Sequence, residues 1–262
     1  DPGFIGKDLH LSEDGKAVTE SEYWADYYEH PDFSYEWNNG YLEELPVSDY
    51  DNQDMYAWFV KTAEVYLEYR PVAKRTIMDF GFRLALPRET KVRKPDMAFV
   101  LKSGSVVPEG KDRSFSGTFD LCVELISDAT EKDISRDTKE KKKEYEAVGI
   151  REYFILDSSG AHMAFYRRNR KGQYAKIRRI NGDIIRSQVL PGFQFRISDL
   201  KHRRPSLKEM AEDEVYQEFV LPYYRKESER AEKAEKLLAL ERKAKEQERR
   251  AKEQEKQRAD EA

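Results

Sequence analysis

The sequence has only one cysteine, four histidines and no long apolar run. Cys122 has no intrachain partner for a disulfide, which fits a reducing compartment. No run is long enough to cross a bilayer, and the first residues lack the basic start and apolar stretch of a signal peptide. Zinc-finger, Walker and Rossmann glycine motifs are absent. These absences predict a soluble cytoplasmic protein with no membrane partner.

The histidines give no support for a metal site of their own. His10, His30, His162 and His202 show no ligand spacing, whereas a zinc site needs closely spaced ligands. We therefore expect them to be surface or structural residues.

Charge is abundant and unevenly distributed. Asp, Glu, Lys and Arg make up 37% of the 262 residues, which predicts a charged segment outside the core. Residues 1–60 carry 2 Lys or Arg against 15 Asp or Glu, and residues 61–224 carry 32 against 25. This basic middle region is compatible with a polyanionic partner but does not establish one.

The chain begins with the pattern of a helix followed by a hairpin. Residues 19–30 start with the capping residue Thr19 and carry Glu22 three positions later, which predicts a helix. Residues 33–46 predict a hairpin, because Asn39-Gly40 tolerates positive φ at the turn.

A second helix and two strands are expected next. Residues 51–70 place Met55, Phe59, Ala63 and Tyr66 at helical spacing. Residues 76–87 and 92–102 read as strands joined by the polar turn 88–90.

The centre of the chain has the order strand, helix, strand. Residues 119–126 and 152–157 are short apolar runs typical of buried strands, with a helix between them. This order favours a parallel pair with a right-handed crossover. Residues 162–169, 174–180 and 192–197 read as a closing antiparallel set.

The last part of the chain, from about residue 225, consists almost entirely of Glu, Lys, Arg, Gln and Ala. The motif AKEQE recurs after seven residues, at 244–248 and 251–255. The best seam is weakly apolar: Leu237, Leu240, Ala244, Gln247, Ala251 and Gln254. A solvated single helix is therefore favoured over a stable coiled coil, while a homodimer formed through this helix stays open. We divide the chain into an N-terminal extension (1–18), a main domain (19–204) and a charged helical C-terminal extension (205–262).

One lysine of the central helix lies on the face that should press on the sheet. At about 100° per residue, Lys141 shares a face with Ile134, Thr138, Tyr145 and Val148, whereas Lys139 and Lys143 point away. Burying an ammonium without a partner is costly. Lys141 therefore either snorkels to water, pairs with Asp137 one turn earlier, or has a catalytic role.

Two carboxylates precede this lysine on neighbouring strands. Pro95-Asp96 opens one strand and Glu124 lies in the next. Carboxylates that hold Mg²⁺ through oxygen ligands, with a cation that orients water and stabilises charge on phosphate, are the requirements of metal-dependent phosphodiester cleavage.

These residues resemble the bacterial "putative restriction endonuclease" family within the PD-(D/E)xK nuclease superfamily. The matching positions, spread over residues 20–200, are Tyr35-Glu36, Gly40 to Leu45, Lys94-Pro95-Asp96, Asp120 to Ser127, Arg136-Asp137, Lys141, Tyr145, Gly149-Ile150, Glu152-Tyr153, Asp157 and Leu190-Pro191-Gly192. The resemblance implies an α/β restriction-endonuclease-like fold, with a mixed β-sheet core flanked by helices. It also implies cleavage of nucleic acid, taken here as DNA, with Mg²⁺, for which Mn²⁺ should substitute.

The resemblance assigns catalysis to Asp96, Glu124 and Lys141, and the metal to Asp96 and Glu124. Ile126 stands where the superfamily's motif has its lysine, two positions after Glu124. Lys141 matches the place to which this family has moved that lysine, and the helical spacing selects the same residue.

Further residues receive supporting roles. Glu36 and Glu44 match family carboxylates and are candidates for a supporting role in binding metal or water, although a solvated strand face is the favoured interpretation for at least one of them. Gln53 stands near a histidine of relatives and is a candidate for hydrogen bonding to phosphate. The expected nucleic-acid contacts are Arg93, Lys94, Lys142, Arg167 and Arg168, together with the basic run 201–204. Basic residues at exposed turns are equally compatible with a solvated surface.

The sequence is compatible with two functions. The first is a Mg²⁺-dependent endonuclease that uses Asp96, Glu124 and Lys141. The second is a nucleic-acid-binding or assembly module with the same fold and little or no cleavage, suggested by the acidic first third, by Ile126 and by the charged tail. Metal-dependent cutting distinguishes them.

Overall fold

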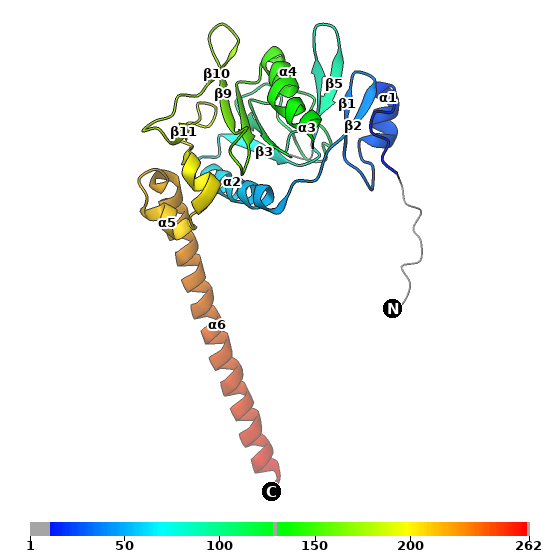
Figure 1. Cartoon of the computed structure of the whole chain (residues 1–262). Helices are drawn as coiled ribbons and strands as arrows, with labels where there is room; N and C mark the ends of the chain where they lie inside the picture. Colours follow the sequence, from blue (N-terminus) through cyan, green and yellow to red (C-terminus); the bar gives the residue numbers. More distant parts are fainter. Residues whose placement is uncertain (1–10, 128–129, 261–262) are drawn as a thin grey trace. The chain divides into compact units, whose positions relative to one another are not determined.

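The computed structural model describes residues 11–127 and 130–260 (Figure 1). The chain separates into two compact units, Asp1–Arg204 and Pro205–Ala262. His10 and the first ten residues of the expected N-terminal extension lie outside the described part. No helix within 11–127 and 130–260 is both long and apolar enough to cross a membrane.

The first unit begins with a helical turn beside a small sheet. Helix α1 (Glu20–Glu22) is capped by Thr19 in the expected capping box and continues as the π-helical turn η1 (Tyr23–Tyr27). Strands β1 (Tyr35–Asn38) and β2 (Tyr41–Glu44) form the expected hairpin, and its turn residues Asn39 and Gly40 have φ values of 47° and 103°. The predicted helix and hairpin are therefore confirmed.

Each of the two long strands expected at 76–87 and 92–102 is in fact two strands in different sheets. Strands β3 (Ala73–Ile77) and β6 (Met97–Leu101) belong to a six-stranded sheet. Strands β4 (Phe82–Ala85) and β5 (Thr90–Arg93) pair with each other in the four-stranded sheet of order β2-β1-β5-β4.

Local backbone chemistry explains both breaks. Met78 and Asp79, between β3 and β4, have φ values of 44° and 48°, in the left-handed region that interrupts a strand. Pro95, between β5 and β6, has no N–H to donate to a sheet ladder. The chain therefore changes sheet at Met78-Asp79 and again at Pro95.

The six-stranded sheet has the order β10-β9-β8-β7-β6-β3. Strands β7 (Leu121–Leu125) and β8 (Glu152–Leu156) are its parallel pair, as predicted, and its other neighbours are antiparallel. The crossover consists of α3 (Glu131–Ser135), the π-helical turn η2 (Arg136–Glu140) and α4 (Lys141–Val148). Gly149 ends α4 with a φ of 94°, which favours glycine.

The two faces of this sheet pack against different elements. Because side chains alternate along a strand, Tyr153 and Ile155 of β8 join a core with Tyr145 of α4. Phe154 points the other way and packs on Phe195, whose ring also contacts Phe59 of α2 (Tyr50–Tyr69). The sheet is therefore covered on both sides, as the buried strands predicted.

The closing strands differ from the expected single set. Strands β9 (Ala164–Arg168) and β10 (Tyr174–Lys176) complete the large sheet, but β12 (Gln194–Arg196) pairs with β11 (Ile184–Arg186) in a separate two-stranded sheet. The π-helical turn η3 (Asp199–Arg203) follows. Strand β11 is only three residues long, which is too short for a clear alternating pattern.

The second unit is helical. Ser206 caps α5 (Leu207–Glu212) in a capping box, and α6 (Gln217–Asp260) runs for 44 residues with Pro222 inside it. Leu237, Leu238 and Leu240 are exposed. Self-association through this helix stays a prediction.

Candidate active site

Asp96 and Glu124 lie on the neighbouring strand segments of the large sheet that the sequence predicts. Asp96 immediately precedes β6, and its neighbour Met97 pairs with Val123 of β7. The backbone N–H of Leu125 donates to Asp96 Oδ2 at 2.6 Å. Glu124 is buried at 2% exposure. Both side chains leave the strands on the face covered by α4, because Ala98 and Cys122, two residues away on each strand, belong to the core that contains Tyr145.

Lys141 lies at the centre of a group of carboxylates. Its ammonium is 2.9 Å from Glu124 Oε2, and 3.2 Å from both Glu36 Oε1 and Asp137 Oδ1. The residue is only 1% exposed, so it does not snorkel. The expected ion pair with Asp137 is present. It is part of a larger cluster whose other members, Glu124 and Glu36, lie outside this helix and could not be inferred from its sequence.

Glu124 has a second hydrogen-bond donor. The hydroxyl of Tyr145 donates to Glu124 Oε1 at 2.6 Å, while Lys141 occupies Oε2. Tyr145 is one helical turn after Lys141, so both donors come from the same face of α4. The sequence placed Tyr145 on this face without giving it a role.

A buried arginine fixes Glu36 from the other side. The Arg93 guanidinium donates to Glu36 Oε2 at 2.9 Å and to Glu43 Oε2 at 2.5 Å. It also forms a two-pronged contact with Glu144, at 2.8 and 2.9 Å. The backbone N–H of Lys94 donates to Glu36 Oε1 at 2.7 Å. Glu36 therefore connects Arg93 to Lys141 within one network.

Burial and charge set the pKa values in this cluster. Burial raises the pKa of Asp96 to about 6, against the attraction of Lys141. Burial, reinforced by nearby carboxylates, also raises the pKa of Glu124 above its usual range. For Glu36 the attraction of Lys141 and Arg93 outweighs burial and lowers the pKa to about 2. Burial alone would lower the pKa of Lys141, but Glu124, Glu36 and Asp137 raise it, so its ammonium stays protonated at neutral pH.

An open cleft leads to Asp96. It has a volume of about 700 Å³ and lies between residues 32–34, residues 44–48, Met78-Asp79, Asp96 and Leu125. Gln53 and Glu44 line it, and the Gln53 amide donates to the Ser48 carbonyl oxygen at 2.7 Å. Lys94 lines it as well. We call this hollow the cleft.

The family described as "Putative restriction endonuclease" (Uma2) matches residues 21–198, which is more than half of the chain. The chain belongs to the Uma2 family. No curated protein matches it significantly. A crystal structure from Anabaena variabilis ATCC 29413, described as a putative nuclease belonging to DUF820, has the same fold, with a TM-score of 0.55 and 11% identity over 72% of this chain and 99% of that chain.

In this Uma2 protein Arg93 cannot make the nucleic-acid contact expected of it. Its side chain is fully buried and paired with Glu36, Glu43 and Glu144. The basic sequence around it suggested an exposed charge, but the three carboxylates come from distant segments. Lys94 is also buried, at 3% exposure, with its ammonium donating to the Tyr28 carbonyl oxygen at 2.8 Å, although it borders the cleft.

The other expected contacts lie away from the cleft. Arg167 pairs in register with Glu152, which pairs with Leu121, three residues before Glu124 on β7. This offset corresponds to about 10 Å along the strands, and the Arg167 guanidinium is bound to Glu152 at 2.7 Å. Arg168 follows it on β9. The Lys142 ammonium lies over the Tyr166 ring, 4.4 Å from its centroid. The structure does not bring these residues together with Asp96.

The chemistry of the cluster fits a divalent cation. Three carboxylates, Glu124, Glu36 and Asp137, lie within 3.2 Å of the Lys141 ammonium, and the buried Arg136 guanidinium is 3.7 Å from Asp137. Asp96 has no cation within 4 Å among the described residues, although it feels the charge of Lys141. The buried Asp137 Oδ1 makes no hydrogen bond, although Lys141 Nζ is 3.2 Å away. Within 11–127 and 130–260 no group of three or more His, Cys, Asp or Glu side chains is placed to hold a metal ion together, so a cation here would have at most two protein side chains as ligands. A cation held by Asp96 and Glu124 would take its remaining ligands from water, as Mg²⁺ commonly does.

Burial of the Asp96 carboxylate, with the nearby Asp137 and Glu36 as smaller contributions, predicts that its charge destabilises the metal-free protein at neutral pH. Its pKa is higher in the folded than in the unfolded protein. The free-energy cost of burying its ionised carboxylate is therefore absent below a pH of about 4 and complete above about 6. We expect Asp96→Asn to raise the free energy of unfolding by about 2–3 kcal/mol at pH 7.5 in EDTA, and the gain to shrink at pH 4. Urea denaturation at both pH values measures it. An equal gain in unfolding free energy at both pH values would show that the buried charge of Asp96 is not its cause. Mg²⁺ should raise the Tm of the wild type and not that of the variant.

Proposed function

We propose that this protein is a Mg²⁺-dependent endonuclease that hydrolyses phosphodiester bonds of DNA. Membership of the Uma2 family supports a nuclease. The observation that carries the proposal is the placement of Lys141: a fully buried ammonium between Glu124 and Glu36, beside an Asp96 that opens into the cleft. A cluster built only for stability would gain nothing from an excess of carboxylates.

Asp96, Glu124 and Lys141 have different roles in this proposal. Asp96 and Glu124 would hold Mg²⁺, which supplies Lewis-acid polarisation of the phosphate and lowers the pKa of water. In the metal-free protein Lys141 stays charged at neutral pH, because Glu124, Glu36 and Asp137 raise its pKa. Its role is to donate hydrogen bonds and to stabilise the negative charge that develops on the phosphate. Each hydrolysis consumes one water and leaves a phosphate monoester and a hydroxyl.

Glu36, Tyr145 and Gln53 have supporting roles. Glu36 and Tyr145 hold Lys141 and Glu124 in position through their own contacts. Gln53 lies in the cleft with one amide N–H bound to Ser48, and its second N–H would donate to phosphate. Glu44 borders the cleft and would contribute a carboxylate to its wall.

The test is cleavage of supercoiled plasmid and of single-stranded DNA with Mg²⁺ or Mn²⁺, with EDTA as the blank. We expect Asp96→Asn and Glu124→Gln each to lower the rate at least about 100-fold. Asp26→Asn and Glu109→Gln replace exposed carboxylates outside the cleft and should retain the wild-type rate. Cleavage that survives both active-site substitutions would refute the proposal. Salt-sensitive binding without any metal-dependent cutting would favour the binding module instead.

A further inference from the structure

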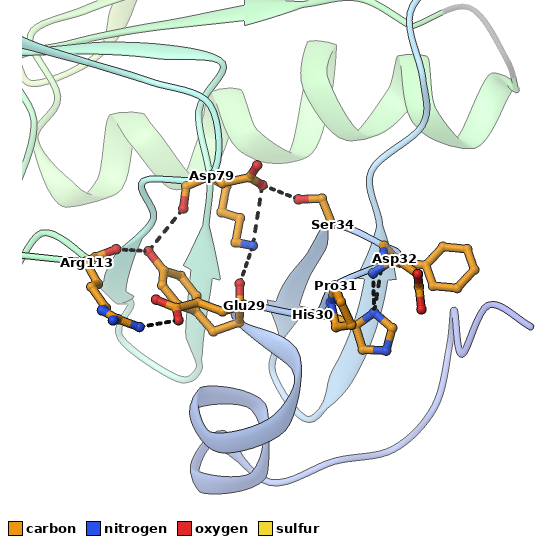
Figure 2. Close-up of a pocket in the computed structure, with 10 residues that line it drawn as sticks. Glu29, His30, Pro31, Asp32, Ser34, Asp79 and Arg113 are labelled. Atoms are coloured by element: carbon orange, nitrogen blue, oxygen red, sulfur yellow. Dashed lines mark hydrogen bonds and ion pairs between the residues drawn. The ribbon is translucent and has the colours of Figure 1, made fainter. Parts of the chain in front are cut away.

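A second pocket adjoins the cleft. It has a volume of about 540 Å³ and lies between residues 28–34, Asp79, Lys94 and Arg113 (Figure 2). Residues 32–34, Asp79 and Lys94 line both hollows. We call it the side pocket. Its size is within the range of sites for small organic groups, and a nucleic-acid strand in the cleft would pass its entrance.

The walls of the side pocket are fixed by internal contacts. The buried Tyr28 hydroxyl accepts from the Gly81 N–H at 2.8 Å and lies 2.7 Å from the Arg113 carbonyl oxygen. Ser34 donates to the Asp79 carboxylate, and Figure 2 shows this contact across the pocket. Segments distant in sequence are thereby held together, so the pocket is formed before any ligand enters.

The charges of the side pocket favour neither phosphate nor a cation. Arg113 is paired with Glu29 at 2.5 Å, and the Lys94 ammonium lies 3.6 Å from Asp79. These pairs neutralise one another and leave Asp32, whose carboxylate is in no ion pair with any residue of 11–127 or 130–260. One free carboxylate would repel phosphate, and one is a weak site for a cation. The better partner is a neutral group that carries N–H donors.

Asp32 and His30 together present an acceptor beside a donor. His30 Nδ1 accepts from the backbone N–H groups of Asp32 and Phe33, both at 3.2 Å. In the neutral ring the proton is therefore on Nε2, which becomes a donor. Phe33 is half-buried and adds an aromatic surface that both hollows share. An aromatic surface with a hydrogen-bond acceptor and a donor is the chemistry that receives a nucleobase.

We infer that the side pocket binds an unpaired base of the strand that is cut, so that the substrate is single-stranded or locally unpaired nucleic acid. The inference rests on the proposed nuclease function. A base in a duplex is stacked, with its pairing edge occupied, and would have to be extruded before it could reach Asp32. The base must carry N–H donors on that edge, which an abasic residue lacks.

The experiment compares one end-labelled oligonucleotide as a single strand and as a duplex. Cleavage is followed with Mg²⁺, and binding is measured by fluorescence anisotropy with Ca²⁺ in its place. We expect the single strand to be bound and cut at least about 10-fold better than the duplex. A single abasic residue, moved along the strand, should raise KM at one fixed distance from the cut.

Asp32→Asn is the decisive variant, because it keeps the size of the side chain and removes its charge. We expect a rise in KM for the single strand of about 10-fold with kcat unchanged. Asp26→Asn, an exposed carboxylate of η1 outside the side pocket, is the matched control and should have no effect. If the single strand and the duplex are cut equally well and Asp32→Asn leaves KM unchanged, the inference is wrong and the proposed nuclease function stands. If the single strand binds in an Asp32-dependent way but is not cut, the nuclease function is wrong and base binding in the side pocket stands.

Discussion

Lys141→Met is expected to lower the rate of DNA cleavage by at least about 100-fold, because no other described cation is within 4 Å of Glu124 to replace its ammonium. Methionine keeps the length and the apolar stem of lysine and removes the charge. The loss should appear in kcat more than in KM, since the ammonium acts on charge that develops during the reaction. Steady-state cleavage of plasmid DNA with Mg²⁺ measures both.

The controls separate catalysis from folding. Lys143→Met, two residues further along the same helix, changes an exposed side chain and should keep the wild-type rate. Removal of Lys141 also leaves Glu124, Glu36 and Asp137 without their shared partner, which costs about 3–5 kcal/mol in comparable buried sites. Rates must therefore be compared at a temperature where circular dichroism shows the variant folded. A folded Lys141→Met protein with normal kcat would contradict the assigned role.

The position of Lys141 was predictable because its signal is local. Its helix shows a face made of Ile134, Thr138, Tyr145 and Val148, and a lysine within such a face is anomalous in the sequence itself. The π-helical turn η2 interrupts the helix just before Lys141, and the lysine still points inward. Asp96 and Glu124 were predictable for a related reason, since Asp96 immediately precedes one apolar strand, Glu124 lies in another, and the two strands are neighbours.

The role of Arg93 was not predictable from the sequence. Its partners Glu36, Glu43 and Glu144 are 57, 50 and 51 residues away, on two strands of the small sheet and on α4. The periodicity of a single segment cannot predict contacts with residues so distant in sequence. The basic neighbours of Arg93 suggest an exposed surface instead. The same limit applies to Arg167 and Arg168, whose distance from Asp96 depends on the register of β7, β8 and β9.

The sequence patterns located the apolar strand segments but not the sheets to which they belong. They predicted one strand where the structure has β3 and β4, and one strand where it has β5 and β6. Met78 and Asp79 did not indicate the break, because a left-handed conformation is uncommon for any residue other than glycine. Pro95 was a visible break, but which sheet each half joins depends on pairing with β1 and with β7, which are distant in sequence.

Arg93→Met is expected to destabilise the first unit about as strongly as Lys141→Met. The substitution leaves Glu36, Glu43 and Glu144 with only Lys141 and Lys91, among the described residues, as cationic partners. Removing one partner of such a cluster costs about 3–5 kcal/mol. A domain is commonly stable by only about 5–15 kcal/mol, so the variant should unfold at much lower urea concentration or fail to accumulate. Arg88→Met, at the exposed turn between β4 and β5, should change stability by less than about 0.5 kcal/mol.

The pH dependence identifies the origin of this loss. Arg93, together with Lys141, holds the pKa of Glu36 at about 2, well below its usual value, so their stabilising effect is present above a pH of about 4.5 and is lost as the pH falls toward 2. The difference in unfolding free energy between wild type and Arg93→Met should therefore be largest at neutral pH and should narrow in acid. Urea denaturation between pH 7 and pH 3 measures this difference. A constant difference would mean that Arg93 acts through packing rather than through its charge, and the link from Arg93 through Glu36 to Lys141 would lose its electrostatic basis.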